Sequence, residues 1–97
     1  MSIGTEEIYH LKCFQQPGKR EAEILFLLPE KSKVVLKINN ENDTEVRMLI
    51  NETLESAEYE VAFLYGNLLA GNYHIKLIIQ TENIIDINSL IIQIPSL

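Results

Sequence analysis

The feature that most constrains the fold of this chain is a two-residue repeat of its apolar side chains. In residues 21–28, EAEILFLL, the apolar residues Ala22, Ile24 and Phe26 occupy every second position. Successive side chains of a β-strand point to opposite faces, whereas a helix repeats about every 3.6 residues. The same alternation, rich in β-branched and aromatic residues, recurs in residues 33–39, 58–65 and 72–79.

Three further segments have strand-like composition, namely 6–14, 45–50 and 84–94. About seven short strands separated by turn residues are typical of an immunoglobulin-like sandwich. We therefore expect an all-β fold, an Ig-like antiparallel β-sandwich of about seven strands. The expected parts of this single domain, 1–97, are an N-terminal strand or arm at 1–15 and a core at 21–94.

Polar and glycine-rich segments between these runs predict turns. Residues 29–32 (PEKS) and 80–83 (QTEN) are short enough for hairpins. Residues 39–44 (NNENDT) carry side chains that bond their own backbone and tolerate positive φ. No helical segment is convincing: the best candidate is a single turn in residues 50–60, and the apolar residues there form no stripe.

Composition and charge exclude several classes of partner. The chain has 97 residues, with 14 acids against 8 bases and a net charge of −6. Nucleic-acid binding and membrane insertion are not expected, because there is no basic stripe and no apolar run of about 20 residues. Since no export signal is evident, the chain as written is expected to be cytoplasmic; as a piece of a larger exported protein it would be secreted or at the cell surface.

An ordered set of short motifs lies between residues 22 and 94. It includes Leu28-Pro29-Glu30, then Asn67-Leu68 followed by Gly71 and Tyr73. In this order the motifs resemble the C-terminal sorting domain of type IX secretion cargo in Bacteroidetes, which is similar to the Ig-like domain of flagellar hook-capping proteins. The resemblance implies a structural role for Pro29, Asn67, Leu68, Gly71 and Tyr73, and recognition of exported cargo without chemistry.

Gly71 and Tyr73 also have a direct physical interpretation. A glycine just ahead of a strand suits a positive φ or a close backbone approach. Tyr73 is then expected to bury its ring while its hydroxyl reaches a backbone group at the corner of the sandwich.

No constellation of residues indicates an enzyme, a cofactor, a metal or a small-molecule substrate. His10 and Cys13 lie three residues apart and would point to opposite faces of a strand. Asn39–Asp43 could offer oxygen atoms to calcium, but the spacing of a calcium-binding loop is missing and a solvated hairpin turn is favoured. The paired glutamates fit the polar face of a strand, and catalysis is not expected.

Several strands are apolar on both faces, which an isolated sandwich would avoid. We expect the outward residues to form an interface with a protein partner or, as a homo-oligomer, with a second copy, unless a bulge turns them inward. The candidate interface residues are Leu25, Leu27, Val35, Ala62 and Leu64.

The function expected from these features is that of a non-catalytic interaction module resembling the sorting domain. One alternative is a free-standing cytoplasmic protein that self-associates or docks a partner through an apolar sheet face. A carbohydrate-binding or adhesion module is a further alternative, although the chain has no tryptophan and its tyrosines fall mostly at inward positions.

Overall fold

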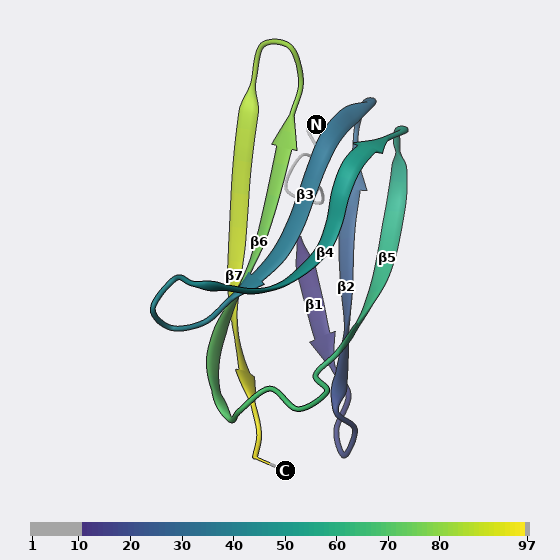
Figure 1. Cartoon of the computed structure of the whole chain (residues 1–97). Coiled ribbons are helices and arrows are strands. Elements are labelled where there is room, and N and C mark those ends of the chain that lie inside the picture. The colour runs from purple at the N-terminus through teal and green to yellow at the C-terminus, as the bar shows by residue number, and fades with distance from the viewer. Residues whose placement is uncertain (1–10, 97) are drawn as a thin grey trace, which may run out of the picture.

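A computed structural model describes residues 11–96 as two antiparallel sheets packed face to face (Figure 1). One sheet has the strand order β1-β2-β5 and the other has the order β4-β3-β6-β7. The prediction of an all-β sandwich of seven strands is confirmed. The strands are β1 (Lys12–Gln15), β2 (Glu21–Leu28), β3 (Ser32–Asn39), β4 (Glu45–Leu54), β5 (Ala57–Leu64), β6 (Gly71–Gln80) and β7 (Ile85–Ile94).

The fourth strand distinguishes this arrangement from the constant type of immunoglobulin domain. In that type the fourth strand joins the sheet of the first, second and fifth strands. Here β4 pairs with β3 instead, which leaves three strands in one sheet and four in the other. The larger sheet therefore offers the broader outer face.

Three expectations about boundaries and turns need correction. Residues 29–32 do not form a hairpin, because β2 and β3 belong to different sheets and their connection crosses between them. The segment 50–60 has no helical turn, since β4 and β5 extend to within two residues of each other and residues 55–56 connect them. The first strand begins at Lys12, and the earlier part of the predicted strand 6–14 lies outside the described residues.

Both corrected connections follow from burial. Leu28 and Val34 are fully buried on either side of the first crossing, so β2 and β3 each turn one face inward rather than pairing edge to edge. Pro29, which has no N–H for a ladder, begins that crossing. Tyr59 of β5 stacks on Phe26 of β2, with ring centroids 5.3 Å apart. This contact holds β5 against β2, and it depends on the extended backbone at Tyr59.

The core lies between the sheets and follows the two-residue alternation. The inward residues of β2, β3 and β6 are each at most 7% exposed: Ala22, Ile24, Phe26, Leu28; Val34, Leu36, Ile38; Tyr73, Ile75, Leu77 and Ile79. Burial of such apolar area is the main stabilising contribution in a domain of this size. Two bulges occur in β4, opposite β3, at Leu49 and Val46.

Tyr73 forms the corner that the sequence predicts. Its ring is buried, and its hydroxyl donates a hydrogen bond of 2.7 Å to the carbonyl oxygen of Leu69, four residues upstream. Gly71 has φ = 152°, a positive value that a residue with a Cβ rarely adopts. The backbone can therefore turn from the crossing loop into β6 with Tyr73 already directed inward.

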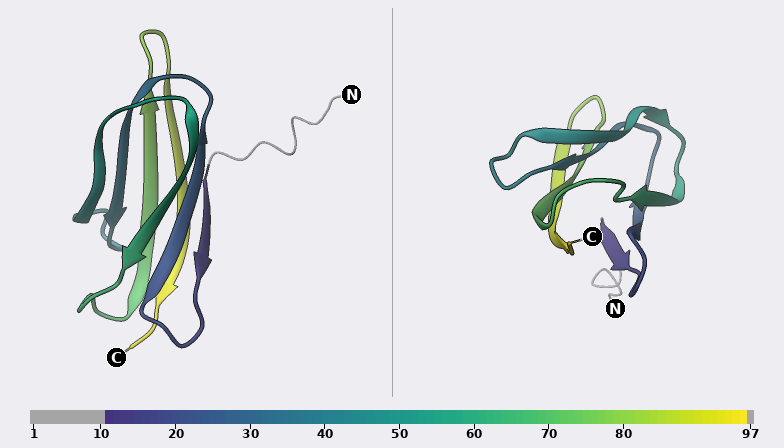
Figure 2. Two further views of the ribbon diagram at one scale, coloured as in Figure 1. Left: turned by 90° about the vertical axis from the view of Figure 1, so that its right-hand side faces the viewer. Right: turned by 60° about the horizontal axis from the view of Figure 1, so that its bottom comes forward.

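Two arginines hold the same loop at the lower end of the molecule. Arg20 donates to the carbonyl oxygens of Gly66, Leu68 and Pro95. Arg47, from β4 of the other sheet, donates to the carbonyl oxygens of Leu64 and Tyr65, at 2.7 and 3.4 Å. These bonds tie the end of β5, the crossing loop and the C-terminal residues together, where Figure 2 shows the strands converging.

The corner predicts a measurable cost for Tyr73→Phe. The substitution keeps the ring but removes a partly buried hydrogen bond, so the free energy of unfolding should fall by about 1 kcal/mol. Tyr59→Phe is a matched control, because its hydroxyl makes an equally long bond to Glu55, also four residues upstream, at an exposed site. The control should cost less than about 0.5 kcal/mol in urea denaturation. Equal losses for the two variants would contradict a special role for the corner.

Candidate interaction face

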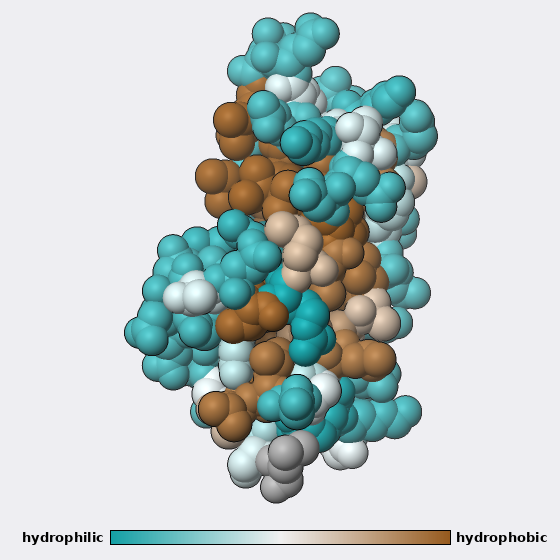
Figure 3. All heavy atoms as spheres, in the orientation of Figure 1, coloured by the Kyte–Doolittle hydropathy of each residue, from teal (hydrophilic) through white to brown (hydrophobic). Residues whose placement is uncertain are grey.

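The outer face of the four-stranded sheet carries an unbroken apolar row. Val35 on β3 lies opposite Ile78 on β6, which lies opposite Ile87 on β7. Ile85 and Ile87 are 61% and 63% exposed, and Ile91, further along β7, is 68% exposed. Figure 3 shows apolar side chains gathered over much of this side of the molecule, with hydrophilic side chains around them. We call the outward residues Val35, Ile78, Ile85, Ile87 and Ile91 the isoleucine face.

Lysines border the apolar row on both sides. Lys33 lies beside Gln80 on one side, and Lys37 lies directly opposite Lys76 on the other. Like charges placed opposite one another destabilise a sheet. Within residues 11–96, neither Lys33 nor Lys37 forms an ion pair, so their charges are available to a partner.

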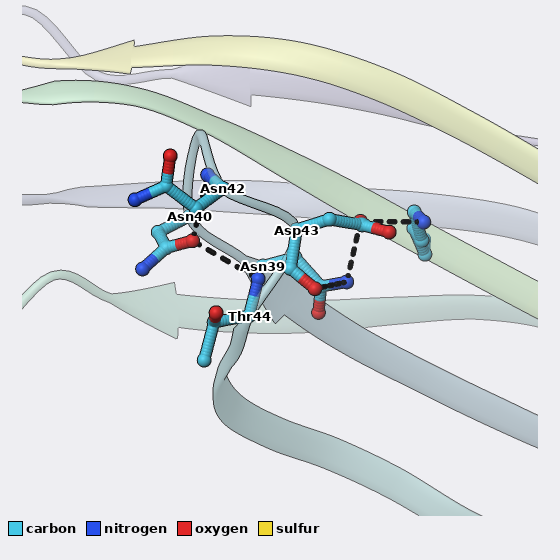
Figure 4. Close-up of polar contacts among 6 residues, drawn as sticks. Asn39, Asn40, Asn42, Asp43 and Thr44 are labelled. Atoms are coloured by element: carbon cyan, nitrogen blue, oxygen red, sulfur yellow. Dashed lines mark hydrogen bonds and ion pairs between the residues drawn. The ribbon is translucent and has the colours of Figure 1, made fainter.

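Asp43 relieves part of the repulsion between the two opposed lysines. Its Oδ1 lies 2.8 Å from Nζ of Lys76 and 3.0 Å from Nδ2 of Asn39 (Figure 4). The hydrogen bond from Lys76, followed by that from Asn39, lowers the pKa of the Asp43 carboxyl group. Asp43 therefore remains ionised and fixes the position of Lys76 at the border of the isoleucine face.

The hairpin at residues 39–44 is held by its own polar side chains, although Oδ1 of Asn39 is buried without a hydrogen-bond partner among the described residues. The Asn40 side-chain oxygen accepts hydrogen bonds from the backbone N–H groups of Asn42 and Thr44 (Figure 4). Asp43 adopts φ = 64°, the positive value expected for an Asn/Asp-rich turn. These contacts fit the solvated hairpin turn, because Oδ1 of Asn40 is directed at the loop's own N–H groups and Oδ1 of Asp43 is directed at Lys76 and Asn39.

The structure places the five predicted interface residues on two different faces. Val35 lies on the isoleucine face, but the other four lie on the outer face of the three-stranded sheet. There each apolar residue stands opposite a glutamate: Leu25 with Glu60, Leu27 with Glu58, Ala62 with Glu23, and Leu64 with Glu21. The predicted residues therefore do not form one patch, and the three-stranded sheet has no unbroken apolar row of this kind. No bulge turns them inward, because both bulges are in β4.

Ile85, Ile87 and Ile91 were missing from the sequence prediction. In residues 84–94 the polar residues Asp86 and Asn88 would ordinarily be placed on the solvent side. The hairpin that joins β6 to β7 pairs Gln80 with Ile85 and reverses this expectation. Asp86 and Asn88 share the inward side with Leu90, and the isoleucines face outward. The predicted hairpin at 80–83 is the feature from which these residues can be predicted. Paired residues share a face, so the inward and outward residues of β6 determine those of β7.

Two other candidate sites are a hollow at the lower end of the molecule and the thiol of Cys13. An open hollow of about 610 Å³ lies beside Gln15, Tyr65 and Gln93 at the lower end. The side-chain nitrogen of Gln15 already donates hydrogen bonds to the Tyr65 hydroxyl, at 2.8 Å, and to the Gln93 carbonyl oxygen, at 2.7 Å. Burial raises the pKa of the Cys13 thiol, so the reactive thiolate is disfavoured.

Among the described residues, no group of three or more His, Cys, Asp or Glu side chains could hold a metal ion. His10, half of the suggested His10–Cys13 pair, lies outside the described residues. The part of the chain that the structure describes contains no helix long and apolar enough to cross a membrane.

The residues that carry the sorting-domain resemblance act within the fold. Leu68 packs against the core and its carbonyl oxygen accepts a hydrogen bond from Arg20, while Gly71 and Tyr73 form the corner. Pro29 accepts a bond of 3.0 Å from Ser56, and Asn67 is exposed in the crossing loop. No protein-family model matches the chain, and no curated protein and no solved structure matches it significantly.

The contact between Lys76 and Asp43 predicts a specific titration. In Lys76→Met the pKa of Asp43 should rise toward that of an ordinary aspartate, whereas Lys33→Met, on the same face, should leave it unchanged. In the wild type, this ion pair stabilises the fold above the unfolded-state pKa, and the contribution is lost as the pH falls through the lowered folded-state pKa. NMR titration of the carboxyl carbon measures both variants. An unchanged pKa in Lys76→Met would contradict the assignment.

Proposed function

We propose that this chain is a non-catalytic interaction module that binds a protein partner through the isoleucine face. The observation that carries the proposal is the row Val35–Ile78–Ile87, which crosses three strands without a polar interruption. The exposed face of an antiparallel sheet is normally polar, and large exposed apolar patches mark interaction sites. The lysine border adds the charge that would orient such a partner.

The chemistry of the face specifies the partner. It should present apolar side chains at its centre and carboxylates at its edge, to meet Lys33 and Lys37, because Lys76 is already paired with Asp43. This positive border stands out in a chain with a net charge of −6. The opposite outer face carries Glu21, Glu23, Glu58 and Glu60 beside its leucines. An acidic partner would therefore be attracted to one face and repelled from the other.

Three observations support this function over the alternatives. The Cys13 thiol has a raised pKa, which disfavours a nucleophilic role. Tyr59, Tyr65 and Tyr73 lie on the inner side of the sandwich, so they offer no stacking surface to a sugar. The contacts of Gly71, Leu68 and Tyr73 within the fold explain why these residues are present without an export signal. A role in export is therefore supported only by the sequence resemblance.

Site-specific photo-cross-linking in cells that naturally express the chain tests the proposal. A photo-reactive residue at position 87 should form an adduct with a second protein, identified by mass spectrometry. Position 64 is the matched control, because Leu64 is 58% exposed and Ile87 is 63% exposed, but Leu64 lies on the acidic face. Adding Lys37→Glu should reduce the adduct at position 87 several-fold, since it reverses the charge that meets the partner.

Two results would contradict the proposed function. Adducts of equal yield at positions 64 and 87 would show that exposure alone governs the reaction. If the product at position 87 contains only the chain itself, or if no product forms, the proposal that this face binds a different protein is contradicted. Circular dichroism of each variant establishes that the sandwich is intact.

A further inference from the structure

We propose that two copies of this chain pair through the free edges of β7, antiparallel to one another, so that their four-stranded sheets join into one continuous sheet. This inference concerns the backbone edge of β7, beside which Ile85 and Ile91 of the isoleucine face lie. It does not depend on the proposed function, and it holds whether or not that face binds another protein.

The edge of β7 is long and has little of the usual protection. Natural sheets protect their edges with short strands, bulges, proline, lysine, inward-pointing charges or a covering element. β7 has ten residues, none of them proline or lysine, and Asp86 is its one inward-pointing charge. Among residues 11–96, β7 pairs with β6 alone. β1 of the other sheet lies near the free edge of β7 (Figure 2), and its Gln15 side chain donates a hydrogen bond to the carbonyl oxygen of Gln93.

The hairpin determines which backbone groups point to the free edge. The N–H of Thr81 donates to the carbonyl oxygen of Ile84, at 2.9 Å, so these residues form a hydrogen-bonded pair. Such pairs alternate along an antiparallel ladder. The even-numbered residues of β7 therefore bond β6, and the odd-numbered ones face outward. Gln93 agrees, because its carbonyl oxygen accepts from Gln15. The outward-facing groups are those of Ile85, Ile87, Ser89, Ile91 and Gln93.

One register suits pairing of β7 with itself. With Asn88 on the two-fold axis, Ile85 of each copy lies opposite Ile91 of the other, and Ile87 lies opposite Ser89. Both partners in each pair have outward-facing backbone groups, so the ladder can form. A register shifted by one residue on each strand would pair Ile85 with Gln93, whose carbonyl oxygen Gln15 already occupies. The register on Asn88 leaves that bond intact.

The same register covers two of the exposed isoleucines of the strand. Ile85 and Ile91, 61% and 68% exposed, would cover each other across the joint. The side-chain nitrogen of Asn88 is buried without a hydrogen-bond partner among the described residues. At the axis, Asn88 of the second copy brings an amide oxygen to the same side of the sheet.

The charge pattern favours a second copy as the occupant. Asp86 is the single charged residue of β7, and in this register it lies opposite Leu90 of the other copy, so no like charges meet. A two-fold pairing also closes, because the same edge of each copy meets its counterpart and β7 is then used up in both chains. β4, the other edge strand of this sheet, is interrupted by its two bulges. Each copy carries a net charge of −6, so salt should screen the repulsion and strengthen the pair.

A charge-swap series on the purified full-length chain tests both the pairing and its register. Sedimentation equilibrium should show a dimer that persists in added salt. Ile85→Glu and Ile91→Lys should each shift the protein to monomer, because each places a charge against an isoleucine of the other copy. The double variant Ile85→Glu/Ile91→Lys should recover the dimer, because opposite charges then face each other at both ends. Leu69→Lys, at a loop residue 79% exposed, should leave the mass unchanged.

Three results would overturn the proposal. A wild-type protein that remains monomeric across the concentration and salt series would remove the dimer. Failure of the double variant to recover a dimer that the single variants lose would remove the pairing on Asn88. Growth beyond a dimer that disappears in salt would indicate head-to-tail contact of the lysine-bordered face with the acidic face instead. Circular dichroism of every variant confirms that the substituted sandwiches remain folded.

Discussion

The rest of the four-stranded sheet depends on the phase of β6, that is, on which of its alternate residues face the core. Gly71 and the Tyr73 corner direct the first residues of the strand, so that Tyr73, Ile75 and the later alternate residues face inward. A slip of one residue would move that whole set to solvent. Because β6 is central, its pairing with β3 and β7 passes this phase to both neighbours. The outward isoleucines of β7 follow from the need to bury the inward side of β6.

The two outer faces of the sandwich differ in chemistry although their strands look alike. On the three-stranded sheet, Leu25 and Leu27 alternate with glutamates on the neighbouring strand. On the four-stranded sheet, Val35 continues into Ile78 and is bordered by lysines. A molecule with an acidic face and a basic-bordered apolar face can orient an acidic partner before contact is made. The charge arrangement and the apolar row therefore favour the same side of the molecule.

Local patterns in the sequence were sufficient to predict the strands, most turns and the corner. The alternation in residues 21–28 and 72–79 places the correct residues in the core, and Tyr73 behaves as its position at the start of a strand, just after Gly71, suggests. The pairing of strands was harder, because it depends on contacts between distant residues. The crossing at Pro29 resembles a hairpin turn in sequence, and residues 50–60 are the best candidate for a helical turn although they form no apolar stripe. Burial of Leu28, Val34 and Phe26 decides both cases.

The candidate site could be predicted only in part for the same reason. Leu25 and Val35 each look like an outward apolar residue within its own strand. Only the order of the strands reveals that Leu25 stands beside Glu60 while Val35 stands beside Ile78. The face of β7 could not be predicted from its own residues, because polar residues ordinarily mark the solvent side, whereas Asp86 and Asn88 lie on the inward side near a sheet edge.

Residue-resolved amide hydrogen exchange of β7, at a dilution where copies do not associate, tests the central claim most directly. The account predicts slow exchange at Asp86, Asn88, Leu90 and Ile92, whose N–H groups bond β6. Ile85, Ile87, Ser89 and Ile91 should exchange rapidly, because their N–H groups face the free edge. The opposite pattern would mean that β7 has the reverse phase, with its isoleucines directed inward, and would contradict both the isoleucine face and the pairing edge.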